Sequence, residues 1–396
     1  MTSAAITFNV GSSSIKFAVY TESEAGLDCR LKGNIARIGQ QPEASLSAAT
    51  GPSQLPAFTG DDTHETIVSA LLSWIGETLG GISIAAIGHR VVHGGRTFKA
   101  PVVVTPEIIQ QLEELSPLAP NHQPGNIAGI RAVEKAMPHV TQIAVFDTAF
   151  HRTQPAVAEQ FAIPKQLTDA GVIRYGFHGL SYDYISSVVP DQTGTDKGRT
   201  IVAHLGHGAS LCAMMDGKSI ASSMGFSTMD GLMMAKRPGH LDPGVLLHLM
   251  RTEGYGEAEL ANFLNNKCGL LGVSGLSDDM RDLEEADTED AKLAIDLFRY
   301  RVKLEIGAMI AALGGLDTLV FTAGIGENSS ALRQAVCEAF GFLGLQLDGA
   351  ANGANATRIS TPDSAVAVLV IPTNEESVIA RAVFELTARE GLRHAG

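Results

Sequence analysis

The sequence lacks long hydrophobic runs and clustered cysteines. Its longest apolar candidate, residues 366–371, is far shorter than the ~18 residues of a membrane span. The N-terminus shows neither the basic region nor the cleavage site that marks a signal peptide. Cys29, Cys212, Cys268 and Cys337 are scattered, without a CxxC pair, which favours a reducing compartment. These absences predict a cytoplasmic protein with no membrane contact.

Positive charge is also scarce. Charged residues make up 18% of the chain and the formal net charge is −14, so we do not expect a nucleic-acid-binding surface. An acidic protein binds anions only where local groups overcome its overall field. By contrast, the 396 residues are 45% hydrophobic, which is enough for substantial cores in about two or three domains.

Short apolar or β-branched runs alternate with longer helical patterns, which predicts an α/β architecture. Helices should begin after Thr105 and Asp242, each of which precedes a proline, and 289–313 should form a helix that ends at Gly314. The region 40–62 is interpreted as a surface excursion. The strand candidates are 5–9, 15–20, 84–87, 141–146, 200–204, 211–215, 317–321 and 365–371.

An internal repeat stands out. Residues 6–20 (ITFNVGSSSIKFAVY) and 201–215 (IVAHLGHGASLCAMM) align without a gap as strand, small-residue turn and strand. Two such hairpins, one in each half of the chain, predict a duplicated domain facing a shared cleft. Two unrelated hairpins in a large α/β protein would give the same pattern.

The turns of this repeat have a physical use. Consecutive backbone N–H groups without bulky side chains form a concave site for phosphate, and Ser12, Ser13 and Ser14 add hydroxyl donors. Residues 212–219 end like a P-loop, but the first position of that motif requires glycine and here is Cys212, so a true P-loop is absent. Residues 216–219 are instead typical of an Asp-Gly hairpin turn. The segment 318–330, a strand followed by a glycine turn and a helix, is a further candidate for nucleotide contact.

Polar groups gather where predicted strands end, the usual ligand edge of α/β sheets. Each has a plain structural alternative. Asp147 could cap a turn, and Glu375 and Glu376 could complement the dipole of the last helix after Asn374. His89 and His93 have the spacing of a metal pair but no evident third ligand, so zinc is not expected. The polar segments are 88–95, 174–178, 235–239 and 372–376, together with Asp147.

Taken together, these segments resemble the acetate kinase family of the acetate and sugar kinase/actin superfamily. The resemblance covers nearly the whole chain and implies duplicated actin-like (ribonuclease H-like) domains with a cleft between them. Residues 1–150, completed by a helix at 380–396, would form the first domain, and 151–379 a second that binds nucleotide and dimerises. The matching segments are 9–14 (NVGSSS), 88–95 (GHRVVHGG), 145–151 (VFDTAFH), 174–179 (RYGFHG), 204–206 (HLG), 321–328 (FTAGIGEN) and 373–376 (TNEE).

The resemblance implies the reaction ATP + acetate ⇌ ADP + acetyl phosphate by direct in-line transfer. Arg90 and Arg237 would hold the carboxylate and the transferring phosphoryl group, a task that suits the planar guanidinium. His178 would donate to the developing charge with His122 nearby, and Asp147 would orient the carboxylate side. A base is hardly needed, because acetate is already ionised at neutral pH.

The resemblance also implies a metal ion, a nucleotide site and a homodimer. Asn9 and Glu375 would lie on the side of Mg²⁺, with Mn²⁺ as an alternative and Glu375 reaching the ion through water. The implied nucleotide-binding residues are Lys16, His204, Gly206, His207, Gly208, Asp279, Met280, Arg281, Gly324, Ile325, Gly326, Glu327 and Asn328.

The sequence departs from the family pattern in two places near the phosphates. His207 replaces the asparagine of the usual HLGNG turn, from which we expect an altered pH dependence rather than loss of activity. Lys236 and Pro238 flank Arg237, where the family usually has GTRSG.

The acyl pocket departs as well. Besides Arg90, the matching positions are Val92, Asn121, Phe177 and Thr228. Asn121 and Thr228 therefore place polar side chains where the family has apolar ones. Acetate is the expected substrate; propionate, butyrate or a hydroxylated acid is the alternative. An actin-like nucleotide-binding regulator without transfer is a further alternative, which the retained arginines disfavour.

Overall fold

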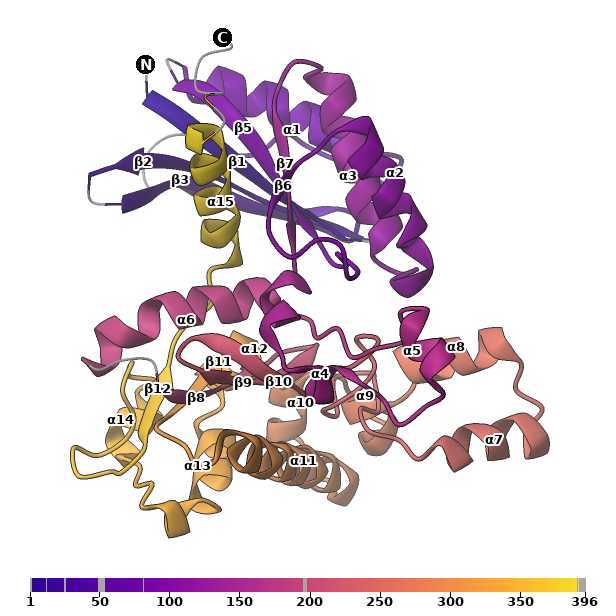
Figure 1. Ribbon diagram of the computed structural model, residues 1–396, viewed down its shortest axis with the longest axis vertical. Helices are drawn as coiled ribbons and strands as arrows, with labels where there is room; N and C mark the ends of the chain where they lie inside the picture. The colour runs from indigo at the N-terminus through magenta and orange to yellow at the C-terminus, as the bar shows by residue number, and fades with distance from the viewer. Residues whose placement is uncertain are drawn as a thin grey trace. The chain divides into compact units, whose positions relative to one another are not determined.

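The structure is a computed structural model that describes residues 2–11, 13–24, 26–48, 54–80, 82–194, 198–389 and 391. Its contacts divide the chain into two compact units (Figure 1). The first comprises Met1–Phe150 with Asn374–Gly396, and the second comprises His151–Thr373. Ser12 of the predicted first turn lies outside the described residues.

The first unit is built on a seven-stranded sheet in the order β4-β3-β2-β1-β5-β7-β6. The central strands β1, β5 and β7 run parallel, and β2, β3 and β4 continue the sheet as an antiparallel meander. The strands are β1 (Thr2–Val10), β2 (Ser14–Ser23), β3 (Gly26–Ala36), β4 (Glu43–Ala48), β5 (Ile82–Val91), β6 (Val102–Val103) and β7 (Gln142–Phe146).

Helices cover this sheet. One core joins inward-facing residues of β1 and β2, including Phe8 and Phe17, to α1 and α3. Helix α15 packs on β1 and β5 at Gly88, where a Cβ atom would collide with Ile379 and Val383. Figure 1 shows α15 crossing the sheet. The helices are α1 (His64–Thr78), α2 (Pro106–Glu114), α3 (Gln123–Ala136), α15 (Glu375–Arg389) and the 3₁₀ turn Ser116–Leu118; a second 3₁₀ turn, Ala149–Thr153, leads into the second unit.

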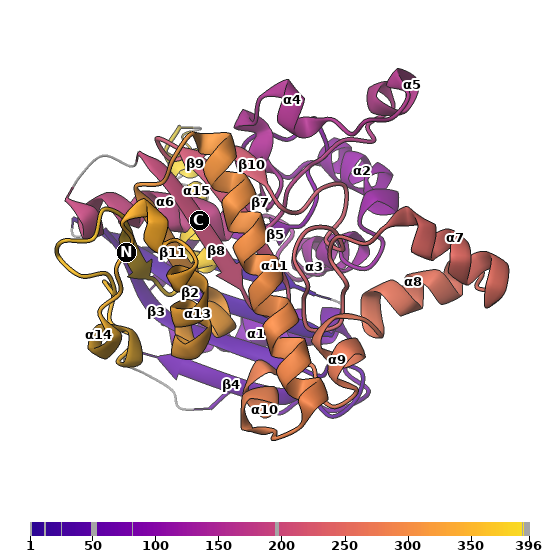
Figure 2. The ribbon, with the colours of Figure 1, turned by 90° about the horizontal axis from the view of Figure 1, so that it is seen from below.

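The second unit has a five-stranded sheet in the order β10-β9-β8-β11-β12. Its long helix α11 packs along the sheet, as Figure 2 shows, and ends at Gly314, whose φ of 69° is left-handed. The strands are β8 (Arg199–Leu205), β9 (Ala209–Met215), β10 (Lys218–Ser222), β11 (Thr318–Thr322) and β12 (Ala367–Val370).

The helices of this unit fall into two sets. Helices α6 and α11–α14 lie around the sheet. Helices α7 and α8 lie side by side and extend away from it in both views (Figures 1 and 2). No helix in the described ranges has the length and apolarity needed to cross a membrane. The helices are α4 (Ala156–Glu159), α5 (Lys165–Asp169), α6 (Gly179–Thr193), α7 (Pro243–Thr252), α8 (Glu257–Asn266), α9 (Gly269–Ser274), α10 (Met280–Glu285), α11 (Glu289–Leu313), α12 (Ala323–Asn328), α13 (Ser330–Glu338), α14 (Gly349–Gly353) and the 3₁₀ turn Gly341–Leu343.

The predicted repeat is confirmed as two antiparallel hairpins, β1–β2 and β8–β9. The predicted turn between β9 and β10 is confirmed too, with φ of 52° at Asp216 and 77° at Gly217. Thr105 and Asp242 cap their helices as the sequence predicted, and Thr288 caps α11.

Two sequence-based boundaries need correction. The region 40–62 is not merely an excursion, because it contains β4, an edge strand whose exposed Ser and Ala side chains give no clear alternation. The last helix begins at Glu375 rather than at 380, since the side chain of Asn374 accepts a hydrogen bond from the backbone N–H of Ser377 (3.2 Å). Its described part ends at Arg389, and residues 392–396 lie outside the described residues.

Candidate active site

Three polar side chains of the first unit meet at the carboxyl edge of its parallel strands. Arg90 near the end of β5 contacts Asp147, which follows β7, through Nε (3.2 and 3.1 Å) and Nη2 (2.5 Å). Its Nη1 donates to Oδ1 of Asn9 on β1 (3.1 Å). The Asp147 side chain is only 1% exposed. The forked pairing fixes the Arg90 guanidinium in one plane.

Carboxylates outnumber the guanidinium at this edge. Burial alone would lower the pKa of Arg90, but the charges of Asp147 and Glu375 outweigh it and the pKa is raised. Burial, and then repulsion by Asp147 and Glu376, raises the pKa of Glu375 to about 7, against the attraction of Arg90 and Lys16. The site therefore has unbalanced negative charge that a cation would relieve.

Two further first-unit candidates lie at the start of α3. Asn121 is exposed just before the helix, and His122 occupies its N-cap position. Val92 is 2% exposed, and its backbone N–H donates to Oδ1 of Asn126 (2.9 Å).

His89 and His93 have separate structural partners. Nε2 of His89 bonds Oε1 of Gln142 (2.7 Å), and burial lowers the His89 pKa to about 4. Nδ1 of His93 accepts from the backbone N–H of Gly95 (3.0 Å). Among the described residues, no group of three or more His, Cys, Asp or Glu side chains could hold a metal ion.

In the second unit, the glycine turn between β8 and β9 is lined by two of the predicted catalytic side chains. A Cβ atom at Gly208 would lie 3.3 Å from Nε2 of His178 and 3.4 Å from Nη2 of Arg237. His178 has φ of 57°, a left-handed conformation that strains a non-glycine residue. A side chain at this position would crowd both groups, so the glycine keeps the space beside them open.

Arg237 differs electrostatically from Arg90. Burial lowers its pKa, and its Nη1 donates to the backbone carbonyl of Thr228 (2.6 Å). No carboxylate within the described ranges forms an ion pair with it, whereas the neighbouring Lys236 pairs with Asp278 (3.3 Å). A desolvated guanidinium without a counter-ion is suited to bind an anionic ligand.

The predicted acyl-pocket residues divide between the units. Val92 and Asn121 belong to the first, and Phe177 and Thr228 belong to the second. Phe177 is 1% exposed, and its backbone carbonyl accepts a hydrogen bond from Nε2 of the buried His151 (2.9 Å). Thr228 is half-buried and presents its carbonyl to Arg237.

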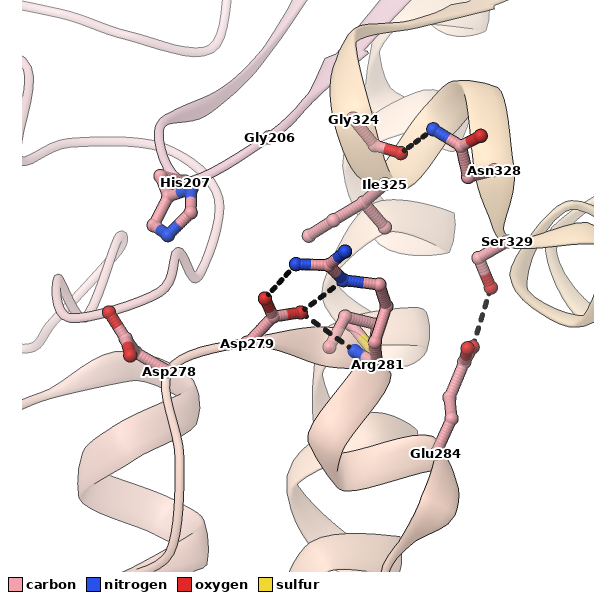
Figure 3. A pocket seen from close by; sticks show the side chains of 11 residues that line it. Gly206, His207, Asp278, Asp279, Arg281, Glu284, Gly324, Ile325, Asn328 and Ser329 are labelled. Atoms are coloured by element: carbon pink, nitrogen blue, oxygen red, sulfur yellow. Dashed lines mark hydrogen bonds and ion pairs between the residues drawn. The ribbon is translucent and has the colours of Figure 1, made fainter. Parts of the chain in front are cut away.

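A pocket of about 460 Å³ lies in the second unit. Figure 3 shows His207 from the β8–β9 turn on one side and Ile325 and Arg281 on the other. Hydrogen bonds from the side chain and backbone of Arg281 lower the pKa of Asp279 to about 2, with His207 contributing. The lining residues are Gly206, His207, Asp278, Asp279, Met280, Arg281, Glu284, Gly324, Ile325, Asn328 and Ser329.

Some predicted nucleotide-binding residues do not line this pocket, and some residues that line it were not predicted. His204, Gly208, Gly326 and Glu327 lie outside the lining, and Lys16 belongs to the first unit. The Glu327 carboxylate instead faces Thr322 and Thr373.

The sequence did not point to Asp278 or Glu284 of the pocket, whereas Ser329 lies within the candidate segment 318–330. Oγ of Ser329 donates to Oε1 of Glu284 (2.6 Å). Glu284 lies one helical turn after Met280, so helix periodicity could have indicated it.

Comparisons with known proteins agree over nearly the whole length. The model of the acetokinase family matches residues 4–381. Acetate kinase of Rhodopseudomonas palustris (strain TIE-1) is 49% identical over 98% of this chain and 99% of its own. Acetate kinase of Rickettsia prowazekii is 42% identical over 95% and 97%.

Solved structures give the same answer. A propionate kinase from Francisella tularensis matches with a TM-score of 0.89 and 35% identity, over 96% of this chain and 98% of its own. The acetate kinase of Porphyromonas gingivalis matches with a TM-score of 0.85 and 38% identity, over 97% and 99%. The chain therefore belongs to the acetokinase family.

Proposed function

We propose that this protein is an acetate kinase, which transfers the γ-phosphoryl group of ATP to acetate and catalyses the reverse reaction. The observation that carries the proposal is Arg237, a desolvated guanidinium that has no counter-ion among the described residues and lies with His178 at the glycine turn of a member of this family. A regulator that only bound nucleotide would have no need for the separate forked pair of Arg90 and Asp147.

The proposed step is direct. An acetate oxygen attacks the γ-phosphorus, the bond to the β,γ-bridging oxygen breaks, and ADP leaves with that electron pair. Arg90, oriented by Asp147, holds the carboxylate, while Arg237 and His178 donate to the equatorial oxygens as charge shifts among them. The pocket of about 460 Å³ holds the adenosine moiety. Positioning and charge neutralisation supply the catalysis, since the nucleophile is already ionised.

The residues of the first unit fit Mg²⁺. Glu375 and Asp147 supply surplus negative charge around Arg90, and Asn9 adds an amide oxygen that contacts Arg90. Mg²⁺ in kinases commonly takes only one or two carboxylates, with waters and phosphates completing the set. Once bound, the ion would neutralise the charge of the phosphates; Mn²⁺ fits the same donors.

Acetate is the proposed acid despite the polar residues of the acyl pocket. Asn121 is exposed, and Thr228 contacts Arg237 through its backbone carbonyl, which any residue could supply. Loss of apolar contact with one methyl group costs only about 1–3 kcal/mol. Propionate is the second candidate, because a solved propionate kinase shares the fold at 35% identity.

Turnover can be tested by following acetyl phosphate with ³¹P NMR. Mg-ATP and acetate should give acetyl phosphate and ADP in equal amounts, and ADP with acetyl phosphate should regenerate ATP. Removing the metal with EDTA should abolish both directions, and added Mg²⁺ should restore them. ATP hydrolysis that does not depend on acetate would overturn the proposal.

We also propose a cytoplasmic location and a homodimer. The four cysteines are free thiols, as in reducing compartments. Helix α7 buries none of its residues within the chain, and Leu247 and Met250 on it are 51% and 50% exposed. On α11, Leu293 and Leu304 are 59% and 50% exposed. Apolar surface of this kind suits contact with a second copy.

The dimer should be visible by sedimentation equilibrium. We expect a mass of two chains at micromolar concentration and a shift toward one chain in a Leu247→Glu/Leu304→Glu variant. A matched change on the polar part of α7, Arg251→Glu, should leave the mass unchanged. A wild-type monomer under these conditions would contradict the proposal.

A further inference from the structure

A buried serine contacts the catalytic histidine of the second unit. Oγ of Ser210 on β9 lies 2.8 Å from Nδ1 of His178, and the same oxygen is hydrogen-bonded to the hydroxyl of Tyr182 on α6. Ser210 and Tyr182 are both 0% exposed. In the gap-free alignment of the two hairpins, Ser210 stands where the first hairpin has the apolar Ile15.

The tyrosine end of this chain of hydrogen bonds supplies its first donor. Burial raises the pKa of Tyr182 well above its ordinary value, so the phenol keeps its proton and can donate a hydrogen bond to Oγ of Ser210. A serine hydroxyl has one hydrogen, which is then free to point at His178. Nδ1 of His178 becomes the acceptor, and the ring proton lies on Nε2.

The position of the histidine favours its neutral form. His178 is the N-cap of α6, where the helix dipole disfavours a positive charge. Its ring also stacks on that of His204, with ring centroids 4.1 Å apart, and Nδ1 of His204 is in turn 2.8 Å from Oγ of Ser181. Nε2 is the nitrogen that faces the glycine turn, 3.3 Å from a Cβ atom placed at Gly208.

We propose that Tyr182 and Ser210 are positioning residues that hold His178 as the neutral tautomer protonated at Nε2, so that it donates a hydrogen bond to the transferring phosphoryl group. This inference rests on the proposed kinase function. Without the serine, Nδ1 of His178 loses the hydrogen bond that fixes the tautomer, so the ring proton can move to Nδ1 and the donor aimed at the phosphoryl oxygens is lost.

The tautomer can be observed directly in the full-length protein. In ¹⁵N-histidine-labelled enzyme, long-range ¹H–¹⁵N spectra distinguish a protonated from an unprotonated ring nitrogen, and His178→Gln assigns the signals. We expect His178 to be protonated at Nε2 in the wild type and to become a mixture in Ser210→Ala. An Nδ1-protonated His178 in the wild type would overturn the proposal, whether or not the enzyme turns over.

Kinetics give the second readout. Ser210→Ala should lower kcat by about 10²-fold and leave KM for ATP within about 3-fold, because the adenosine pocket is untouched. Tyr182→Phe, which keeps the serine but removes the donor behind it, should lie between Ser210→Ala and the wild type.

A matched control separates positioning from a general loss of packing. Oγ of Ser223 accepts from the backbone N–H of Leu211, the residue after Ser210, and is equally buried. Ser223, just past the end of β10, contacts the same strand as Ser210. Ser223→Ala therefore removes a buried hydroxyl next to β9 without touching a histidine, and should keep kcat within about 2-fold. Equal losses of kcat in Ser223→Ala and Ser210→Ala would contradict the proposal, and a wild type without acetate-dependent turnover would contradict the kinase function instead.

Discussion

Replacing Arg237 with methionine is expected to lower kcat for acetyl phosphate formation by about 10³-fold without destabilising the fold. The guanidinium is desolvated, which lowers its pKa, and no carboxylate of the described residues pairs with it. Such a charge costs free energy in the folded state until an anion binds. Removing it should therefore leave the free energy of unfolding unchanged within about 0.5 kcal/mol or increase it.

Urea unfolding and steady-state kinetics on the same preparation test this prediction. Arg237→Lys provides the control, because it keeps a positive charge but loses the planar fork, and it should recover only part of kcat. A clear loss of stability in Arg237→Met would show that the unliganded protein already satisfies this charge and would contradict the account.

Replacing Arg90 with methionine should reduce activity by a similar factor, with the opposite effect on stability. Asp147 is 1% exposed and receives three hydrogen bonds from Arg90, and Glu375 adds a second buried carboxylate. Breaking one partner of a buried ion pair costs about 3 kcal/mol at the lower end of the usual range. The lower end applies because the Arg90 side chain keeps 20% of its surface exposed.

The double variant Arg90→Met/Asp147→Asn separates the two effects. It removes the unpaired carboxylate together with the arginine, so it should regain most of the lost stability and none of the lost activity. Equal stabilities of the single and double variants would show that the pair does not carry the stability of this edge.

The sequence predicted those parts of the fold that depend on local pattern. The two hairpins and the helix starts at Thr105 and Asp242 were readable because their turns and caps require particular residue types. Strand β4 was missed because an exposed edge strand places little demand on its side chains. Asn374 indicated the cap of α15, but the domain boundary at 380 placed the start of the helix five residues too late.

The main site residues could be predicted from the resemblance, whereas one contact that supports them could not. The resemblance supplied Arg90, Asp147, His178 and Arg237, and their contacts gave each a distinct electrostatic setting. The contact between Ser210 and His178 could not be predicted, because it depends on how β9 faces α6, and nothing local in the sequence reports that packing.

Acid preference is the most direct test of the central claim that this chain phosphorylates acetate. Acyl phosphate formed from Mg-ATP, trapped with hydroxylamine, should be measured across acetate, propionate, butyrate and glycolate at equal concentrations. The account predicts the highest kcat/KM for acetate, with Asn121→Leu and Thr228→Pro changing that preference little. A higher kcat/KM for another acid, or no trapped product from any acid in protein that still binds ATP, would contradict it.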